Sequence, residues 1–302
     1  MKNQSILAVA TIATLASVTQ SALAADHEIA SYQLDTEVKI LSDERTRGVS
    51  DSLMQPAIKL SAQLAHESGL VAVAEVVNVS NKQFLSGDGV GVTLGGGYRF
   101  GNPETGHYGV GLATEMFPGA KFDAPHSIDP NTGMPTDIRS TDYNTQFAVL
   151  EIGYGALEGR ILDVISKTYR GADTGGVCGA MLQFAPDQIA ALTNPNSSVN
   201  KCYARGDHDS RGSLLFDLDY KIDVAPSTKL TLHAGYQKVA NFTEANFADY
   251  RISLTRKQWG FEWNADFVTT RTKARELYMV QVGNDIRATD NSRLVFSVSH
   301  KF

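Results

Sequence analysis

The carboxyl-terminal stretch LVFSVSHKF, residues 294–302, carries an apolar or aromatic side chain at almost every second position. This period of two is the pattern of a β-strand. A chain end is usually polar unless neighbouring structure holds it in place. The apolar positions here continue to the last residue, so the stretch predicts a strand whose outer face contacts lipid: Leu294, Phe296, Val298, His300 and Phe302.

The same alternation recurs along the chain. It is clear in eight further segments: 32–40, 58–64, 90–100, 108–116, 214–222, 230–236, 250–254 and 261–267. Three more, 70–79, 146–154 and 157–166, are apolar on both faces, and the last changes phase midway, which is compatible with a bulge. Together these segments predict an all-β fold, a closed antiparallel transmembrane β-barrel of about twelve strands.

The connections between these segments alternate in length. Long links, beginning with 42–55, are each followed by a short one, beginning with 66–69. Outer-membrane barrels show this alternation, with short periplasmic turns and long extracellular loops. A soluble sandwich or a periplasmic binding protein has no reason to keep it. Aromatic residues beside the short links predict a girdle at the periplasmic interface: Tyr98, Phe100, Tyr108, Tyr154, Tyr220 and Phe302.

The amino terminus has the layout of a secretory signal peptide. Lys2 precedes an apolar run at 6–18, and Ala22-Leu23-Ala24 is a small-x-small cleavage site. We therefore expect residues 1–24 to be removed and residues 25–302 to form one barrel in the bacterial outer membrane.

Net charge and cysteine content limit the kinds of partner, cross-link and metal site that we expect in this protein. A formal net charge of −6 argues against a nucleic-acid partner. In an exported chain the two cysteines, Cys178 and Cys202, predict a disulfide that closes a loop of about 25 residues. A metal site fits less well, because no close pair of ligands accompanies the cysteines. No metal and no cofactor are expected.

Enzyme signatures are missing from the sequence. It contains no Gly-x-Ser-x-Gly elbow, no His-Glu-x-x-His and no phosphate-binding loop. His233 falls on a predicted inward position, where a lone histidine is more often a polar lining residue than a base. We expect no enzyme; a membrane-embedded hydrolase is the less favoured alternative, because no nucleophile and base pair is evident.

The polar face of the strands is the predicted pore lining. Acidic and basic residues are mixed there, so at most a mild preference for cations is expected. With about twelve strands the pore should be narrow or partly closed by an infolded loop, for which 117–142 and 170–211 are candidates. The candidates for the lining are Lys59, Glu75, Arg99, Glu115, Asp217, Asp219, Lys221, His233, Arg251, Glu262, Asp266 and Arg293.

Residues 42–69, SDERTRGVSDSLMQPAIKLSAQLAHESG, resemble the opening of the TorF family of porins. That family begins with Ser-Asp-aromatic-Arg-x-Arg-Gly-x-Ser, continues with Pro-Ala and reaches a His-Glu-Ser-Gly turn. Glu44 stands where the family usually has an aromatic residue. The resemblance implies an exported barrel. Within this stretch Arg45 and Arg47 are candidates for the pore entrance, or for contacts with anionic lipid of the outer leaflet.

The sequence thus predicts a porin-like channel for passive diffusion of ions and small solutes. The alternative is a closed structural or adhesive barrel that acts through its external loops. Expected partners are outer-membrane lipids, small solutes and the barrel-assembly machinery, which would read the terminal strand ending in Phe302. A homo-oligomer stays compatible with the sequence.

Overall fold

The computed structural model of the chain describes residues 32–102, 105–129 and 132–302. The predicted signal peptide, 1–24, lies outside these residues. Within the described ranges no helix is long and apolar enough to cross a bilayer.

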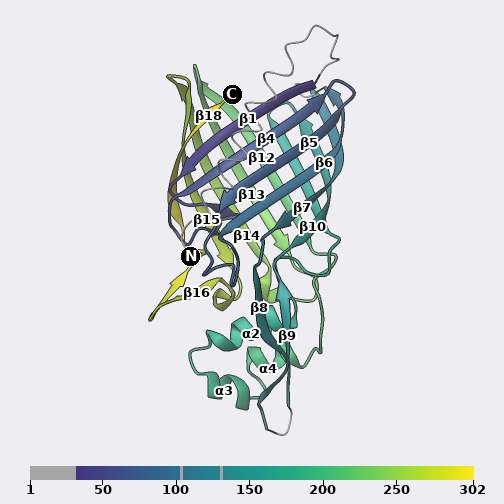
Figure 1. Ribbon diagram of the computed structural model, residues 1–302, viewed down its shortest axis with the longest axis vertical. Coiled ribbons are helices and arrows are strands. Elements are labelled where there is room, and N and C mark those ends of the chain that lie inside the picture. The colour runs from purple at the N-terminus through teal and green to yellow at the C-terminus, as the bar shows by residue number, and fades with distance from the viewer. Residues whose placement is uncertain (1–31, 103–104, 130–131) are drawn as a thin grey trace.

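Twelve antiparallel strands close into a barrel (Figure 1) in the order β1-β18-β15-β14-β13-β12-β11-β10-β7-β6-β5-β4. The predicted fold class is confirmed, and so are the expected number of strands and the alternation of long and short links. The strands are β1 (Tyr32–Leu41), β4 (Ala57–His66), β5 (Leu70–Asn78), β6 (Val90–Asn102), β7 (Gly106–Met116), β10 (Thr145–Tyr154), β11 (Leu157–Val164), β12 (Leu214–Ala225), β13 (Thr228–Lys238), β14 (Phe247–Gln258), β15 (Phe261–Thr272) and β18 (Arg293–Lys301).

The first and last strands close the barrel. β1 pairs with β18 from Glu37↔Lys301 to Leu41↔Ser297, and on its other side with β4. The backbone N–H of Phe302 donates to the carbonyl oxygen of Thr36 at 3.0 Å, so the pairing continues to the last residue. Closure leaves no strand edge without a partner, as a sheet in lipid requires.

The outward face of the barrel is apolar and exposed. Leu112 and Ile152 are each 62% exposed, and Phe296 on the last strand is 58% exposed. A continuous apolar outer surface of this kind is stable only against an apolar solvent such as lipid. The six aromatic residues expected beside the short turns are all exposed, and Trp259, Phe261 and Trp263 extend the same belt.

The long links build additional structure at one end of the barrel, the loop end, below the strands in Figure 1. The hairpin β8 (Lys121–Ile128) and β9 (Pro135–Asp142) projects there, with helices α2 (Thr174–Gln183), α3 (Gln188–Thr193) and α4 (Ser198–Tyr203) beside it. We call these five elements the loop-end module. Shorter elements complete this end: β2 (Arg45–Thr46), β3 (Val49–Ser50), η1 (Thr243–Ala245), η2 (Arg275–Tyr278), β16 (Met279–Val282) and β17 (Asp285–Ala288).

The segments that are apolar on both faces lie next to the module. Phe147 of β10 and Val164 of β11 point inward into an apolar cluster with Tyr169, Val177 and Met181, and so they face protein inside the barrel as well as lipid outside. The bulge considered at 157–166 is not present in β11, because this strand pairs with unbroken register on both sides. A shift of register occurs instead in β12, between Asp223 and Ala225.

The predicted disulfide is present. Cys178 of α2 and Cys202 of α4 are bonded, with their Cα atoms 5.6 Å apart. The bond joins the first and last helices of the module. α2 also lies close against β8, since a Cβ added at Gly175 would come within 3.1 Å of Ala124.

Replacing both cysteines by serine should loosen the module and leave the barrel closed. Loss of a cross-link over a loop of this length costs about 3 kcal/mol or slightly more in the chain-entropy model. Limited proteolysis should therefore cut between residues 170 and 211, while heat-modifiable gel migration of the barrel is unchanged. If the variant loses the protease resistance of the module and the heat-modifiable migration of the barrel together, the module and barrel fold as one unit.

Candidate functional site: the barrel lumen and its inner hairpin

The first long link turns into the barrel. Residues 42–56, which we call the inner hairpin, contain the paired strands β2 and β3 joined by a two-residue turn. Arg47 and Gly48 have φ angles of 51° and 80°, the positive values that a type I′ turn requires. A Cβ on Gly48 would lie 2.1 Å from Oγ1 of Thr270, so the tip rests directly on the inner wall.

Hydrogen bonds within the inner hairpin hold its shape. The carboxylate of Asp43 accepts from the hydroxyls of Ser50 and Ser52 at 2.5 and 3.0 Å, and from Nε of Arg45 at 2.7 Å. The side chains of Ser50, Ser52 and Arg45 are buried, and Asp43 itself is 1% exposed. A buried carboxylate is tolerated only when it is paired in this way. The hairpin is therefore a packed element of the barrel interior.

Arg47 fastens the tip to the wall formed by β12 and β14. Its Nη1 donates to Asp217 at 2.6 Å, and its Nη2 lies 3.5 Å from Asp249. His233 lies beside this pair, with Nδ1 2.9 Å from Asp219 and Nε2 3.0 Å from Asp249. The guanidinium of Arg47 and the imidazole of His233 thus lie among three aspartates of β12 and β14, and Arg160 and Arg251 lie 3.7 and 3.6 Å from two of them.

Arg170 fastens the other side of the hairpin. Its guanidinium donates to Asp51 at 2.8 and 3.0 Å and to Glu115 of β7 at 2.7 and 2.8 Å. The rings of Phe84 and Phe117 lie 5.5 and 5.2 Å from its central carbon. Burial works against the charge, but the two carboxylates raise the pKa of Arg170 well above its usual value. The group stays charged under all ordinary conditions.

A third contact joins the base of the hairpin to β4. Nζ of Lys59 lies 2.7 Å from Glu44 and 3.1 Å from Glu75. Burial raises the pKa of Glu44, although the ammonium of Lys59 acts in the opposite direction. Glu44, near the start of the inner hairpin, is therefore held in an ion pair with the barrel wall.

The register of the strands places all twelve candidate lining residues on the inward face. Lys221 and Glu158, beside the short turns, have side chains that are 36% and 45% exposed. Farther toward the loop end, exposure falls to 7% for Arg47 and 3% for Asp249. The lumen is therefore open at the end with the short turns and filled at the level of the inner hairpin.

Two expectations about the interior are wrong. Arg45 and Arg47 are not exposed at the mouth or toward lipid, because their side chains are 4% and 7% exposed and pair inside. The segment that fills the lumen is 42–56, whereas 117–142 forms the projecting hairpin (Figure 1), and 170–211 contributes chiefly Arg170.

The sequence did not identify several residues that the structure places on the inner face. Asp249, Glu151 and Arg160 lie on inward strand positions, and period-two counting extended over the whole of β10, β11 and β14 would have found them. Asp51 and Arg170 lie in links, where no periodicity indicates which side chains turn inward.

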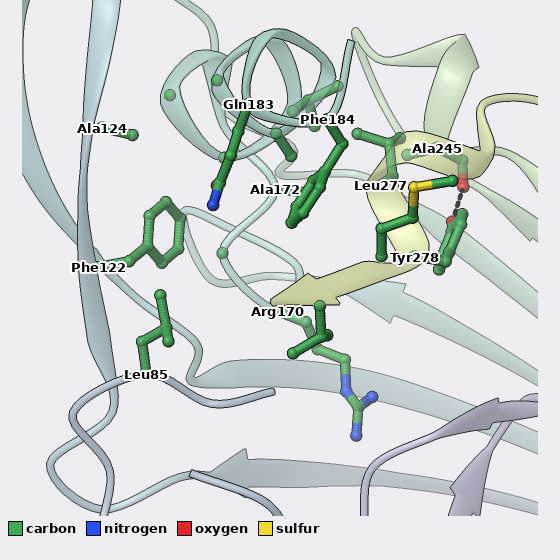
Figure 2. A pocket seen from close by; sticks show the side chains of 18 of the residues that line it. Leu85, Phe122, Ala124, Arg170, Ala172, Gln183, Phe184, Ala245, Leu277 and Tyr278 are labelled. Atoms are coloured by element: carbon green, nitrogen blue, oxygen red, sulfur yellow. Dashed lines mark hydrogen bonds between the residues drawn. The ribbon is translucent and has the colours of Figure 1, made fainter. Parts of the chain in front are cut away.

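A cavity of about 650 Å³ lies between the module and the inner hairpin (Figure 2). Phe122 and Leu85 form one side in this view, Phe184 and Gln183 a second, and Leu277 a third. Thr46 and Val49 of the inner hairpin also line it, as does Arg170.

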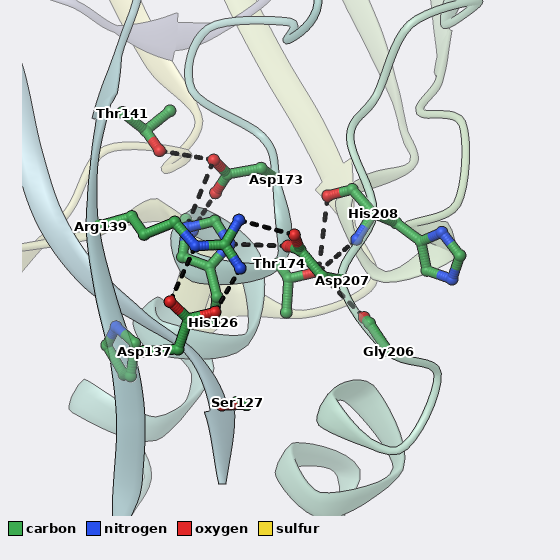
Figure 3. Close-up of polar contacts among 12 residues, drawn as sticks. His126, Ser127, Asp137, Arg139, Thr141, Asp173, Thr174, Gly206, Asp207 and His208 are labelled. Carbon is green, nitrogen blue, oxygen red and sulfur yellow. Dashed lines mark hydrogen bonds and ion pairs between the residues drawn. The ribbon is translucent and has the colours of Figure 1, made fainter.

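Within the module, a polar network fastens the helical part to the projecting hairpin (Figure 3). Nδ1 of His126 on β8 lies 2.7 Å from Asp207, which also accepts from Arg139 of β9 at 2.8 Å. Asp173 caps α2 by accepting from the N–H of Gly176 at 2.7 Å, and it accepts from Thr141 of β9 at 2.5 Å. Among the described residues, no three His, Cys, Asp or Glu side chains are placed to hold a metal ion.

Residues 25–302 match the model of a family described as "Bacterial protein of unknown function (Gcw_chp)", and the chain belongs to this family. No curated protein matches the sequence. Solved structures with similar folds include KdgM porin, at 8% identity and a TM-score of 0.43, with 89% of this chain and 98% of that chain covered.

Two further solved structures are similar at this level. An outer membrane channel from Pseudomonas putida F1 has 11% identity and a TM-score of 0.39, covering 90% of this chain and 96% of its own. The beta domain of the Bordetella autotransporter BrkA has 11% identity and a TM-score of 0.31, covering 90% and 99%. At these scores nothing of their functions is carried over to this chain.

The network in Figure 3 predicts how the module responds to acid. Burial acts to raise the pKa of Asp207, but hydrogen bonds from His126 and Arg139 hold it below the usual value. The ionised form therefore stabilises the module above the ordinary value of about 3.9, and this contribution is lost as pH falls through the lower folded value. Proteolysis within the module should accelerate below that pH.

Asp207→Asn should make the module more easily cut at pH 6 and reduce the additional effect of acid. Asp285→Asn, on the exposed β17, is the matched control and should behave as wild type. An unchanged acid response in Asp207→Asn would assign the acid sensitivity to other carboxylates.

Proposed function

We propose that the protein is an outer-membrane channel through which ions and small solutes diffuse passively, and that the inner hairpin forms its constriction. The barrel stands in lipid by its apolar outer band, with the short turns in the periplasm and the loop-end module outside the cell. The pore is narrow and carries mixed charge. The first part of the TorF-like stretch, residues 42–56, forms the inner hairpin.

The observation that carries this proposal is the change of exposure along the inward face. Charged residues with no role in the outer wall line a lumen that is open at one end. A barrel that served only as an anchor would be equally stable with small uncharged residues there. The lining charges pair across and along strands, for example Arg99 with Glu151 at 2.7 Å, so they set a transverse field of mixed sign.

Asp217 and Asp219 are the proposed determinants of ion preference, because they lie where the open part of the lumen meets Arg47. Asp219 faces His233 and Arg251, and Asp217 faces Arg47 and Arg160. Ions that pass the constriction would meet this group of opposite charges. His233 would then serve as a lining residue, as its position on the inward face predicts.

The second candidate function is a closed barrel that acts through its external loops. The buried ion pairs of the inner hairpin favour it, because Arg47 and Arg170 together hold the segment across the lumen. The module outside the barrel, braced by a disulfide, is then the functional part. A hydrolase has less support, since the inward His233 contacts Asp219 and Asp249 and, among the described residues, no nucleophile.

The remaining proposals concern partners. The terminal strand ending in Phe302 would be recognised by the barrel-assembly machinery, and the exposed outer band would bind outer-membrane lipid.

Single-channel conductance of refolded protein in planar bilayers tests the channel. Wild type should give small discrete steps. Arg47→Ala removes one partner of a buried ion pair, a change that typically costs about 3–5 kcal/mol, and so it should release the hairpin tip and enlarge the steps. The control is Arg256→Ala, which changes an exposed arginine beside a short turn.

Folding of each variant is checked by heat-modifiable gel migration. Enlarged steps in Arg47→Ala alone would support a channel constricted by the hairpin. The absence of steps in both wild type and Arg47→Ala, with the barrel folded, would favour the closed barrel.

A further inference from the structure

We propose that the cavity between the module and the inner hairpin binds an uncharged, mainly apolar small molecule with an aromatic ring, taken up from the loop side. This goes beyond the channel proposal, because binding here requires no conduction.

The size and walls of the cavity fit such a ligand. Its volume of about 650 Å³ lies within the range of ordinary small-molecule sites, which is roughly 300–1,000 Å³. Figure 2 shows the side chains of Phe122, Leu85, Phe184 and Leu277 around one space, contributed by four separate segments of the chain. Aromatic and aliphatic walls on several sides favour a flat apolar body.

The charges around the cavity argue against a charged ligand. Arg170 lines it, but every nitrogen of its guanidinium already donates to Asp51, Glu115 or Thr46. Figure 2 shows that guanidinium directed away from Phe184 and Leu277. The other charged lining residues, Lys82 and Asp123, are exposed to solvent and of opposite sign. A charged ligand would lose its hydration and gain only partners that are exposed to solvent and therefore weak.

The cavity is held open by contacts independent of any ligand. The Cys178–Cys202 bond fixes α2 against α4, and the His126–Asp207–Arg139 network fixes the link that follows α4 on β8 and β9. Preformed sites avoid the cost of ordering their walls when a ligand binds. Because Val49 of the inner hairpin is part of the wall, a bound molecule would also contact the segment that closes the lumen.

The test uses two fluorescent probes with the same aromatic body. N-phenyl-1-naphthylamine is uncharged, and 1-anilinonaphthalene-8-sulfonate is its anionic relative. Both are titrated into full-length mature protein held in amphipol, with empty amphipol as the background. Ala172→Phe should fill the cavity, and Leu85→Gln should make one wall polar without disturbing the fold, since Leu85 is 45% exposed. Ala190→Phe adds the same ring on the exposed surface of α3, outside the cavity, as the matched control.

The neutral probe should bind wild type and Ala190→Phe with one site each, and both cavity variants at least about tenfold more weakly. The anionic probe should bind wild type more weakly than the neutral one. Equal binding of the neutral probe to wild type, Ala172→Phe and Leu85→Gln would overturn the site. Equal affinity for both probes in wild type would overturn the assignment to uncharged ligands. Since neither readout depends on conductance, the site and the channel can fail separately.

Discussion

A charged arginine held inside a barrel is the constraint on which the rest of the interior depends. Arg47 is withdrawn almost completely from solvent, and its stability there requires carboxylates at hydrogen-bonding distance. Asp217 and Asp249 meet that need from two strands separated by β13, so the strand register and the position of the inner hairpin have to agree. Arg170 repeats the arrangement from the opposite side through Asp51 and Glu115. Oppositely charged groups on the hairpin, the wall and a distant loop are thereby joined.

The two faces of each strand contact different surroundings. The outward residues are apolar because they meet lipid, and the inward residues are polar where water reaches them and paired where the hairpin excludes it. Near the loop end the inward face becomes apolar, because Phe147 and Val164 pack against apolar residues of the module. That module, its disulfide and its cavity then stand on the same barrel wall that holds the lumen charges. The proposed channel and the proposed binding site share the inner hairpin as a common wall.

The barrel could be predicted from the sequence because its pattern appears within short segments of the chain. Alternation of single residues in segments such as 294–302, and the alternation of link lengths, are direct consequences of a closed sheet in lipid. The inward side of Asp217 or His233 follows from the same period of two. The inner hairpin could not be predicted in this way: Arg47 looks like any loop arginine, and only the partners on β12 and β14, about 170 and 200 residues away along the chain, show that it is buried. The apolar inward positions of β10 and β11 likewise made sense only with the module in place.

The central claim, that the TorF-like segment lies inside the barrel and rests on its wall, is tested most directly by cross-linking. The Cβ position of residue 48 lies 3.4 Å from Cβ of Thr270, close to the separation found in disulfides. In a variant carrying Gly48→Cys and Thr270→Cys, with the native bond retained, mild oxidation of the folded protein should join the two new cysteines. Peptide mapping by mass spectrometry should then recover a linked pair of peptides from the hairpin and β15. A folded barrel in which both new thiols stay free and open to alkylation after oxidation would place the hairpin outside the lumen and contradict the account.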